Sequence, residues 1–173
     1  MIPNIKALAD DKLSILYLID CLGIPLTNGQ VTRFFTDYSS VNYFDLQQYL
    51  IELISGGLVD EMATGNSQFI SITPKGREAL SYFRKRISPH LRNIIESYAE
   101  KNRSSLKDEN QITADYKKIT DKEYEVICRV MENELVLMEL KLNVPNSQQA
   151  KQICEKWRLR APEVFKAIYD RLV

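Results

Sequence analysis

The sequence predicts an α+β protein built in two parts. In the first third of the chain, apolar residues recur at helical spacing, and two short β-type runs follow. After residue 110 the pattern changes to three longer β-type runs, and helical spacing returns only near the end. We therefore expect an amino-terminal domain over residues 1–87, a connecting helix and linker over 88–110, and a carboxy-terminal domain over 111–173.

Three helices open the amino-terminal domain. The first covers Lys12–Leu22, where apolar residues follow helical spacing. Thr27 and Gln30 form a capping box at the start of the second, because the hydroxyl and the amide satisfy free backbone donors there. The third carries an inward stripe of leucines, Leu46, Leu50 and Leu53. Gly56 and Gly57 end it, since glycine adopts the left-handed cap conformation at little cost.

A β-hairpin and a fourth helix complete this domain. Its strands are Leu58–Met62 and Phe69–Ile72. The tip between them, the wing, contains residue types typical of a turn, Gly65, Asn66 and Ser67. Thr73 and Pro74 are an N-cap and first-turn pair that opens a helix reaching about Ile87.

Two segments at this separation resemble the winged-helix regulators of the PadR and MarR type. The first is Leu50-x-x-Leu53-x-x-x-Gly57-Leu58-Val59, and the second is Ile72-Thr73-Pro74-Lys75-Gly76-Arg77. The resemblance covers roughly residues 8–87. It implies a helix-turn-helix whose third helix enters the major groove of DNA, with the hairpin as wing.

A regulator of this kind binds double-stranded DNA, and the sequence offers residues for that role. Polar side chains of the third helix are assigned to the base edges, Asn42, Tyr43, Gln47 and Gln48. Gln47 is predicted to point outward, because it follows the inward Leu46 by one position. Basic residues outside that helix are assigned to the phosphates, Arg33, Lys75 and Arg77.

The distribution of charge leaves a second function open. The chain has 23 basic and 23 acidic residues, and no Lys or Arg lies between Arg33 and Lys75. That stretch contains five acids, Asp37, Asp45, Glu52, Asp60 and Glu61. Winged helices also serve as protein-binding modules, so the alternative is an adaptor that binds another protein and no DNA. A positive surface beside the third helix favours DNA, and an acidic or neutral one favours the adaptor.

A further helix begins at Ser88 and Pro89 and carries an apolar stripe that includes Leu91, Ile95 and Tyr98. The stripe is interpreted either as core packing or as the contact of a two-fold homodimer, with the carboxy-terminal sheet as the other candidate contact. The polar segment Asn102–Asn110 is predicted to be a linker.

The carboxy-terminal domain is predicted to be a small antiparallel sheet covered by two helices. Its strands are Ile112–Ile119, Tyr124–Glu132 and Leu135–Val144, with a tight turn at residues 132–134. Ser147 is expected to cap the first helix, and Pro162 to open the last. The two-domain arrangement resembles a regulator-like family of Gram-positive bacteria, which implies an architecture and no mechanism. We expect this domain to serve dimerisation or the sensing of an unassigned effector.

Patterns of catalytic and metal-binding residues are absent from the sequence, which contains no GxSxG, HExxH, glycine-rich phosphate loop or Cys/His cluster. Cys21, Cys128 and Cys154 lie in apolar surroundings and are interpreted as reduced core thiols. We therefore predict a non-enzymatic protein without metal or cofactor. No apolar run approaches the roughly 20 residues of a membrane span, so a cytoplasmic protein without membrane contact is expected.

Overall fold

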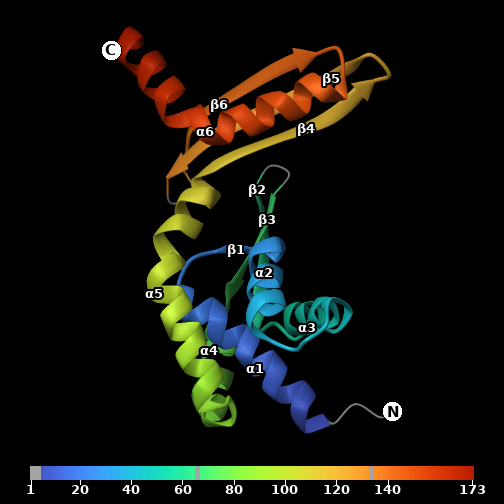
Figure 1. Cartoon of the computed structure of the whole chain (residues 1–173), viewed down its shortest axis with the longest axis vertical. Helices are drawn as coiled ribbons and strands as arrows, with labels where there is room; N and C mark the ends of the chain where they lie inside the picture. Colours follow the sequence, from blue (N-terminus) through green and yellow to red (C-terminus); the bar gives the residue numbers. More distant parts are fainter. Residues whose placement is uncertain (1–4, 65–66, 133–134) are drawn as a thin grey trace. The chain divides into compact units, whose positions relative to one another are not determined.

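The computed structural model describes residues 5–64, 67–132 and 135–173, and its architecture is α+β, as the sequence predicts. The chain divides into two compact units, Met1–Leu106 and Lys107–Val173 (Figure 1). Each unit has a hydrophobic core of its own. None of the described helices is both long and apolar enough to cross a membrane.

The first unit has the element order of a winged helix. Its elements are α1 (Ile5–Leu22), β1 (Leu26–Thr27), α2 (Asn28–Tyr38), α3 (Tyr43–Ser55), β2 (Val59–Thr64), β3 (Ser67–Ile72), α4 (Pro74–Phe83), the short 3₁₀ helix η1 (Arg84–Arg86) and α5 (Pro89–Gln111). The strands form an antiparallel sheet of order β1-β3-β2. The sequence prediction lacked β1, because two residues are too few to show an alternating pattern.

The capping signals at Thr27 and Gly57 place two helix ends where the sequence predicts them, whereas α1 begins at Ile5 and not at Lys12, and α4 ends at Phe83 and not near Ile87. The Thr27 hydroxyl accepts the Gln30 backbone N–H, and the Gln30 side chain accepts that of Thr27, so the capping box is complete. At the end of α3, Gly57 has a positive φ of 68°. The backbone N–H of Leu58 donates to the Leu53 carbonyl at 2.9 Å, which is the long bond of a Schellman cap.

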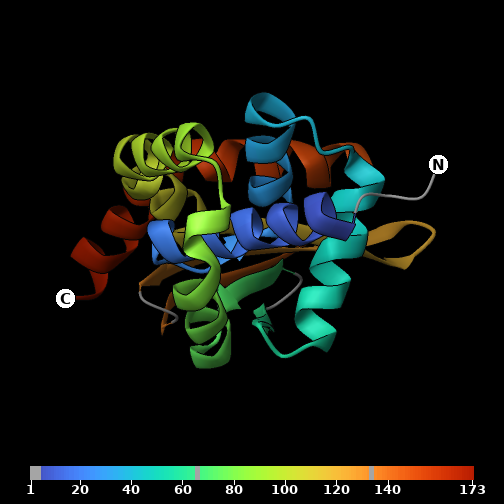
Figure 2. The ribbon, with the colours of Figure 1, turned by 90° about the horizontal axis from the view of Figure 1, so that it is seen from below.

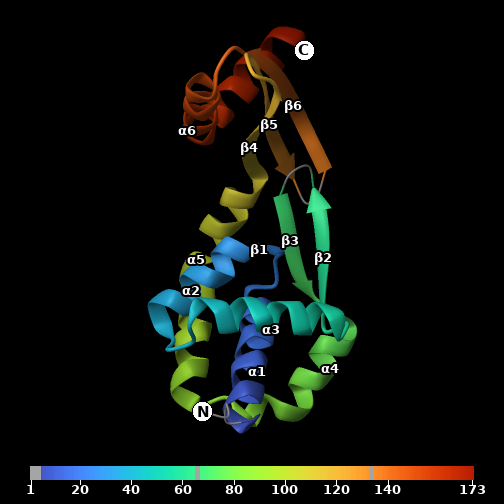
Figure 3. The ribbon, with the colours of Figure 1, turned by 90° about the vertical axis from the view of Figure 1, so that its right-hand side faces the viewer.

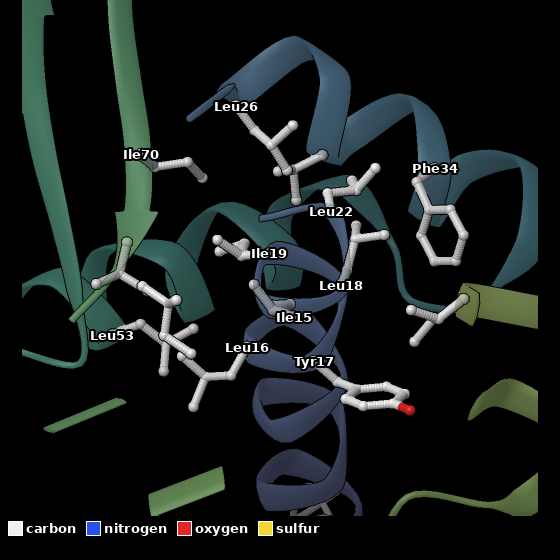
Figure 4. Close-up of a cluster of buried hydrophobic side chains, with 14 of the residues drawn as sticks. Ile15, Leu16, Tyr17, Leu18, Ile19, Leu22, Leu26, Phe34, Leu53 and Ile70 are labelled. Atoms are coloured by element: carbon white, nitrogen blue, oxygen red, sulfur yellow. The ribbon is translucent and has the colours of Figure 1, made fainter. Parts of the chain in front are cut away.

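The core of the first unit is organised around α1, which lies among the other helices of that unit (Figure 2). Its residues 13–19 are all buried. Figure 4 shows side chains of α1 meeting Leu26, Leu53 and Ile70, which come from β1, α3 and β3. One side of α3 therefore packs against α1 and the sheet, and only the other side of this helix faces solvent.

Helix α5 corrects two expectations. The segment 102–110 is helical and not a linker, since Leu106 is buried in the first core and extends the apolar stripe by two further turns. The proposed dimer residues pack within their own unit. Ile95 is fully buried, Leu91 packs partly buried against the same core, and the Tyr98 ring lies 4.9 Å from that of Phe34. This stripe is therefore internal packing.

The second unit is a three-stranded antiparallel sheet of order β4-β5-β6 with one helix. Its elements are β4 (Ile112–Thr120), β5 (Glu123–Glu132), β6 (Leu135–Val144) and α6 (Ser147–Leu172). Figure 3 shows α6 on one face of the sheet. Asn133 and Glu134, expected in the tight turn, lie outside the described residues.

A single helix replaces the two that were predicted to cover the sheet. Pro162 does not open a new helix but lies inside α6, because the buried Trp157 and Ala161 hold the chain on the sheet up to the proline. The cap is also one residue earlier than expected: the Asn146 side chain accepts the Gln149 backbone N–H at 2.8 Å.

Candidate interface on α3

The side of α3 that faces away from the core is exposed and carries two large apolar side chains. Its inward stripe consists of Leu46, Tyr49, Leu50 and Leu53. The opposite side carries the residues that we call the α3 outer face, Phe44, Gln48, Ile51 and Ser55. Phe44 is 82% exposed and Ile51 60% exposed. In Figure 3, α3 lies on the viewer's side of its unit, with no other segment of that unit in front of it.

Gln47 does not point outward as predicted. Its side chain is half-buried, and its amide exchanges hydrogen bonds with the Asn28 amide at 2.7 and 3.0 Å. A third bond joins it to the Thr32 hydroxyl at 3.2 Å. The cause is the packing of α2 against the flank of α3 that Gln47 occupies. Gln48 is exposed, and its amide donates to Glu52 at 2.8 Å.

The first turn of α3 holds the other two residues assigned to base contacts. The Asn42 side chain is the N-cap and accepts the backbone N–H of Asp45 at 2.9 Å, so its carbonyl oxygen serves the helix itself. Tyr43 is 57% exposed, and its ring packs edge-on against that of Phe44 with centroids 5.7 Å apart. Aromatic surface thus extends the α3 outer face at its amino-terminal end.

The basic residues assigned to phosphates lie on α2 and α4 and not on α3 itself. Lys75 donates from Nζ to the Gly56 carbonyl at 2.8 Å, at the end of α3. Arg77 pairs with Asp20 of α1 at 3.1 Å. Arg33 is exposed on α2. Exposed pairs of this kind contribute little energy and rearrange easily. The feature that weighs most against DNA binding is therefore the lack of Lys and Arg on α3 and on both described strands of the hairpin.

Most ionisable side chains beside α3 are acidic, with Lys12 of α1 as a cation among them. Burial raises the pKa of Asp11, and the charges of Asp10 and of Asp45 on α3 raise it further. Negative charge also surrounds the Tyr49 hydroxyl, whose pKa is raised first by burial and then by the carboxylates of Asp11, Asp45 and Glu52. Glu52 itself pairs with Lys12, and this bond lowers the pKa of the Glu52 carboxyl. A phosphate backbone would meet repulsion at this end of α3.

Two of the three wing residues, Gly65 and Asn66, lie outside the described residues. Ser67 begins β3 opposite Thr64 of β2. The described part of β2 presents Asp60, Glu61 and Met62 to solvent. This strand follows α3 directly, so it adds acidic and apolar side chains to the surroundings of the helix and no cation.

Comparison with protein families gives a match over residues 11–172, to a model described as a domain of unknown function (DUF4364). The chain belongs to the DUF4364 family. The match spans both compact units. No curated protein and no solved structure matches the chain.

Sequence reasoning missed Phe44 and Ile51, two exposed apolar residues of α3. The signal was present, because Phe44, Gln48, Ile51 and Ser55 recur at intervals of four, three and four residues, opposite the leucine stripe. Phe44 and Ile51 are the side chains that any ligand of the α3 outer face would touch first.

Proposed function

We propose that this protein is a winged-helix adaptor whose α3 outer face binds a protein. The observation that carries the proposal is the exposure of Phe44 and Ile51 on the helix that a DNA-binding winged helix inserts into the groove. Large apolar side chains gathered on one exposed helix face mark interaction surfaces. DNA offers large apolar side chains few apolar contacts, because base edges and phosphates are polar apart from the thymine methyl group.

The partner that fits this face has an apolar groove with a basic rim. Anchors at positions i, i+4 and i+7 on a helix are the pattern of a helix laid into a groove, and Phe44, Gln48 and Ile51 have that spacing. The acids beside the first turns of the helix, Asp11 and Asp45, favour Lys or Arg around the groove. Burying a Phe or Ile side chain stabilises a complex by about 1.5–3 kcal/mol.

Photo-crosslinking in the source cells tests the proposal. A photoreactive residue at position 48 is expected to yield a protein adduct, and the Phe44→Ser change should reduce its yield at least about tenfold. Asp45→Lys should reduce it as well. The crosslinked segment of the partner should contain Lys or Arg next to apolar residues. The control places the photoreactive residue at Tyr82, which is 73% exposed on α4 and should give no such adduct.

An adduct that survives both substitutions, or a partner segment that is acidic, would show the adaptor proposal to be wrong.

DNA binding is the second candidate, favoured by the winged-helix element order and by the exposed amide of Gln48. Selection of genomic fragments by the purified protein at low salt separates the two functions. The adaptor is expected to retain none. If fragments are retained and Gln48→Ala weakens their binding by about 1–3 kcal/mol, α3 reads DNA and the adaptor proposal fails.

A further inference from the structure

The outer strand of the second unit has a free edge next to apolar side chains. Strand β6 pairs with β5, and within the described part of this unit no strand lies on its other side. Helix α6 lies mainly over β4 and β5 and touches β6 least. Leu142 is 42% exposed although it stands opposite the fully buried Val126. Strand edges of this kind are templates for pairing with another chain.

The two edges of the sheet differ in how well they are protected. Strand β4 carries adjacent lysines, Lys117 and Lys118, and its register with β5 shifts between Lys118 and Thr120. Charge and irregularity at an edge discourage further pairing. From Met138 to Val144, by contrast, β6 keeps an unbroken register with β5, its own shift lying between Val136 and Met138, and the two charges there, Glu139 and Lys141, are of opposite sign. The edge of β6 is therefore the one suited to accept a strand.

The two faces of β6 have different chemistry. Leu140 and Leu142 stand opposite Cys128 and Val126, whose side chains are buried in the second core, so the even-numbered residues from Met138 to Val144 share the helix-covered face. Glu139 and Lys141 lie on the open face. There the Glu139 carboxylate accepts from Arg129 Nε at 2.6 Å and from Lys141 Nζ at 3.2 Å.

The sequence of β6 is complementary to itself in one antiparallel register. A two-fold axis perpendicular to the sheet keeps each face on its own side, so it can pass only midway between a residue and the same residue of the second copy. Centring on Glu139 or on Lys141 would place like charges opposite each other, which is destabilising. Centring on Leu140 places Glu139 opposite Lys141 of the second copy on the open face. The helix-covered face then pairs Met138 with Leu142 of the second copy.

We propose that β6 pairs antiparallel with β6 of a second copy of this chain, centred on Leu140, to form a continuous six-stranded sheet. A second copy is chosen as the partner because of charge complementarity. In this register Glu139 and Lys141 lie opposite residues of the other sign, and Met138 and Leu142 lie opposite apolar residues. Such a contact is isologous, so it closes as a dimer and leaves β4 as the outer edge on each side. This contact involves no residue of the α3 outer face.

Charge reversal with mixing tests the contact. Lys141→Glu and Glu139→Lys should each weaken self-association at least about tenfold, because each creates two like-charge pairs across the axis. An equimolar mixture of these two variants should associate again, because every cross-strand pair is then opposite in sign. Sedimentation velocity measures the outcome, and fluorescence of the buried Trp157 checks that each variant is folded. Lys117→Glu on β4 is the matched control and should associate like the parent.

Cysteine crosslinking tests the register. In a Cys128→Ala background, which removes the thiol opposite position 140 within the chain, Leu140→Cys should form a disulfide-linked dimer under mild oxidation, because opposed residues of an antiparallel pair have Cβ atoms about 5 Å apart. Leu142→Cys should not, because the two copies of that residue would be offset by roughly 13 Å along the strands. A parent protein that sediments as a monomer at tens of micromolar, a mixture that fails to associate, or crosslinking at position 142 in place of 140 would overturn the proposal.

Discussion

Replacement of Gly76 by Ala should destabilise the first unit strongly, although alanine is the better helix former. Gly76 is buried in the first turn of α4. A Cβ atom there would lie 2.1 Å from the Leu58 carbonyl oxygen and 2.8 Å from Cγ1 of Ile72. The nearer obstacle is backbone, so it cannot rotate away as a flexible side chain would.

The magnitude follows from what must move. The Leu58 carbonyl accepts the backbone N–H of Thr73 at 3.1 Å, and displacing it weakens that bond. Overpacking of a core costs about 1–3 kcal/mol, and a backbone hydrogen bond contributes about 1 kcal/mol. We expect the free energy of unfolding to fall by roughly 2–4 kcal/mol, which lowers the urea midpoint by more than about 1 M.

Urea unfolding followed by far-ultraviolet circular dichroism measures this loss. Gly29→Ala is the matched control, because Gly29 lies in the first turn of α2, is exposed, and its Cβ would meet nothing nearer than the Thr27 hydroxyl at 3.9 Å. That variant should be more stable than the parent by up to about 1 kcal/mol. If both variants have the same midpoint, the close approach of α4 to Leu58 is not as described.

Two predictions concern ionisable groups. Burial raises the pKa of the Cys128 thiol to about 11 and also raises the pKa of the Cys154 thiol. A thiol reagent at about pH 8.5 should therefore label neither cysteine in the native protein and both in urea. Rapid labelling of Cys128 in the native protein would contradict its burial. In the first unit, the Tyr17 hydroxyl and the Arg84 guanidinium both donate to Glu96 and hold the pKa of that carboxyl below its ordinary 4.5. A lowered folded pKa stabilises the protein above pH 4.5, and this contribution is lost as the pH falls through the folded pKa. The urea midpoint of the parent should therefore fall more steeply on acidification below pH 4.5 than that of Glu96→Gln. Equal slopes would show that Glu96 does not contribute to the pH dependence of stability.

Features governed by neighbours in the sequence were predictable, and features governed by distant neighbours were not. The caps at Thr27 and Thr73 and the glycine end of α3 depend on residues within one turn, and the structure has them as predicted. The helical state of residues 102–110 depends instead on burial of Leu106 against the first core, which outweighs the polar composition of the segment. The orientation of Gln47 likewise depends on Asn28, nineteen residues away in the sequence.

Pro162 has a consequence for the motions of the second unit. It has no backbone N–H, so the carbonyl of Arg158 lacks the donor that an α-helix normally provides, and α6 changes direction along its length (Figure 1). Before the proline, Ala150, Cys154, Trp157 and Ala161 are buried; after it, Leu172 is 80% exposed and only Val164 packs partly buried against the core. Amide hydrogens after Pro162 should therefore exchange with solvent through local fraying of the last turns, whereas those before it should require opening of the sheet-packed helix.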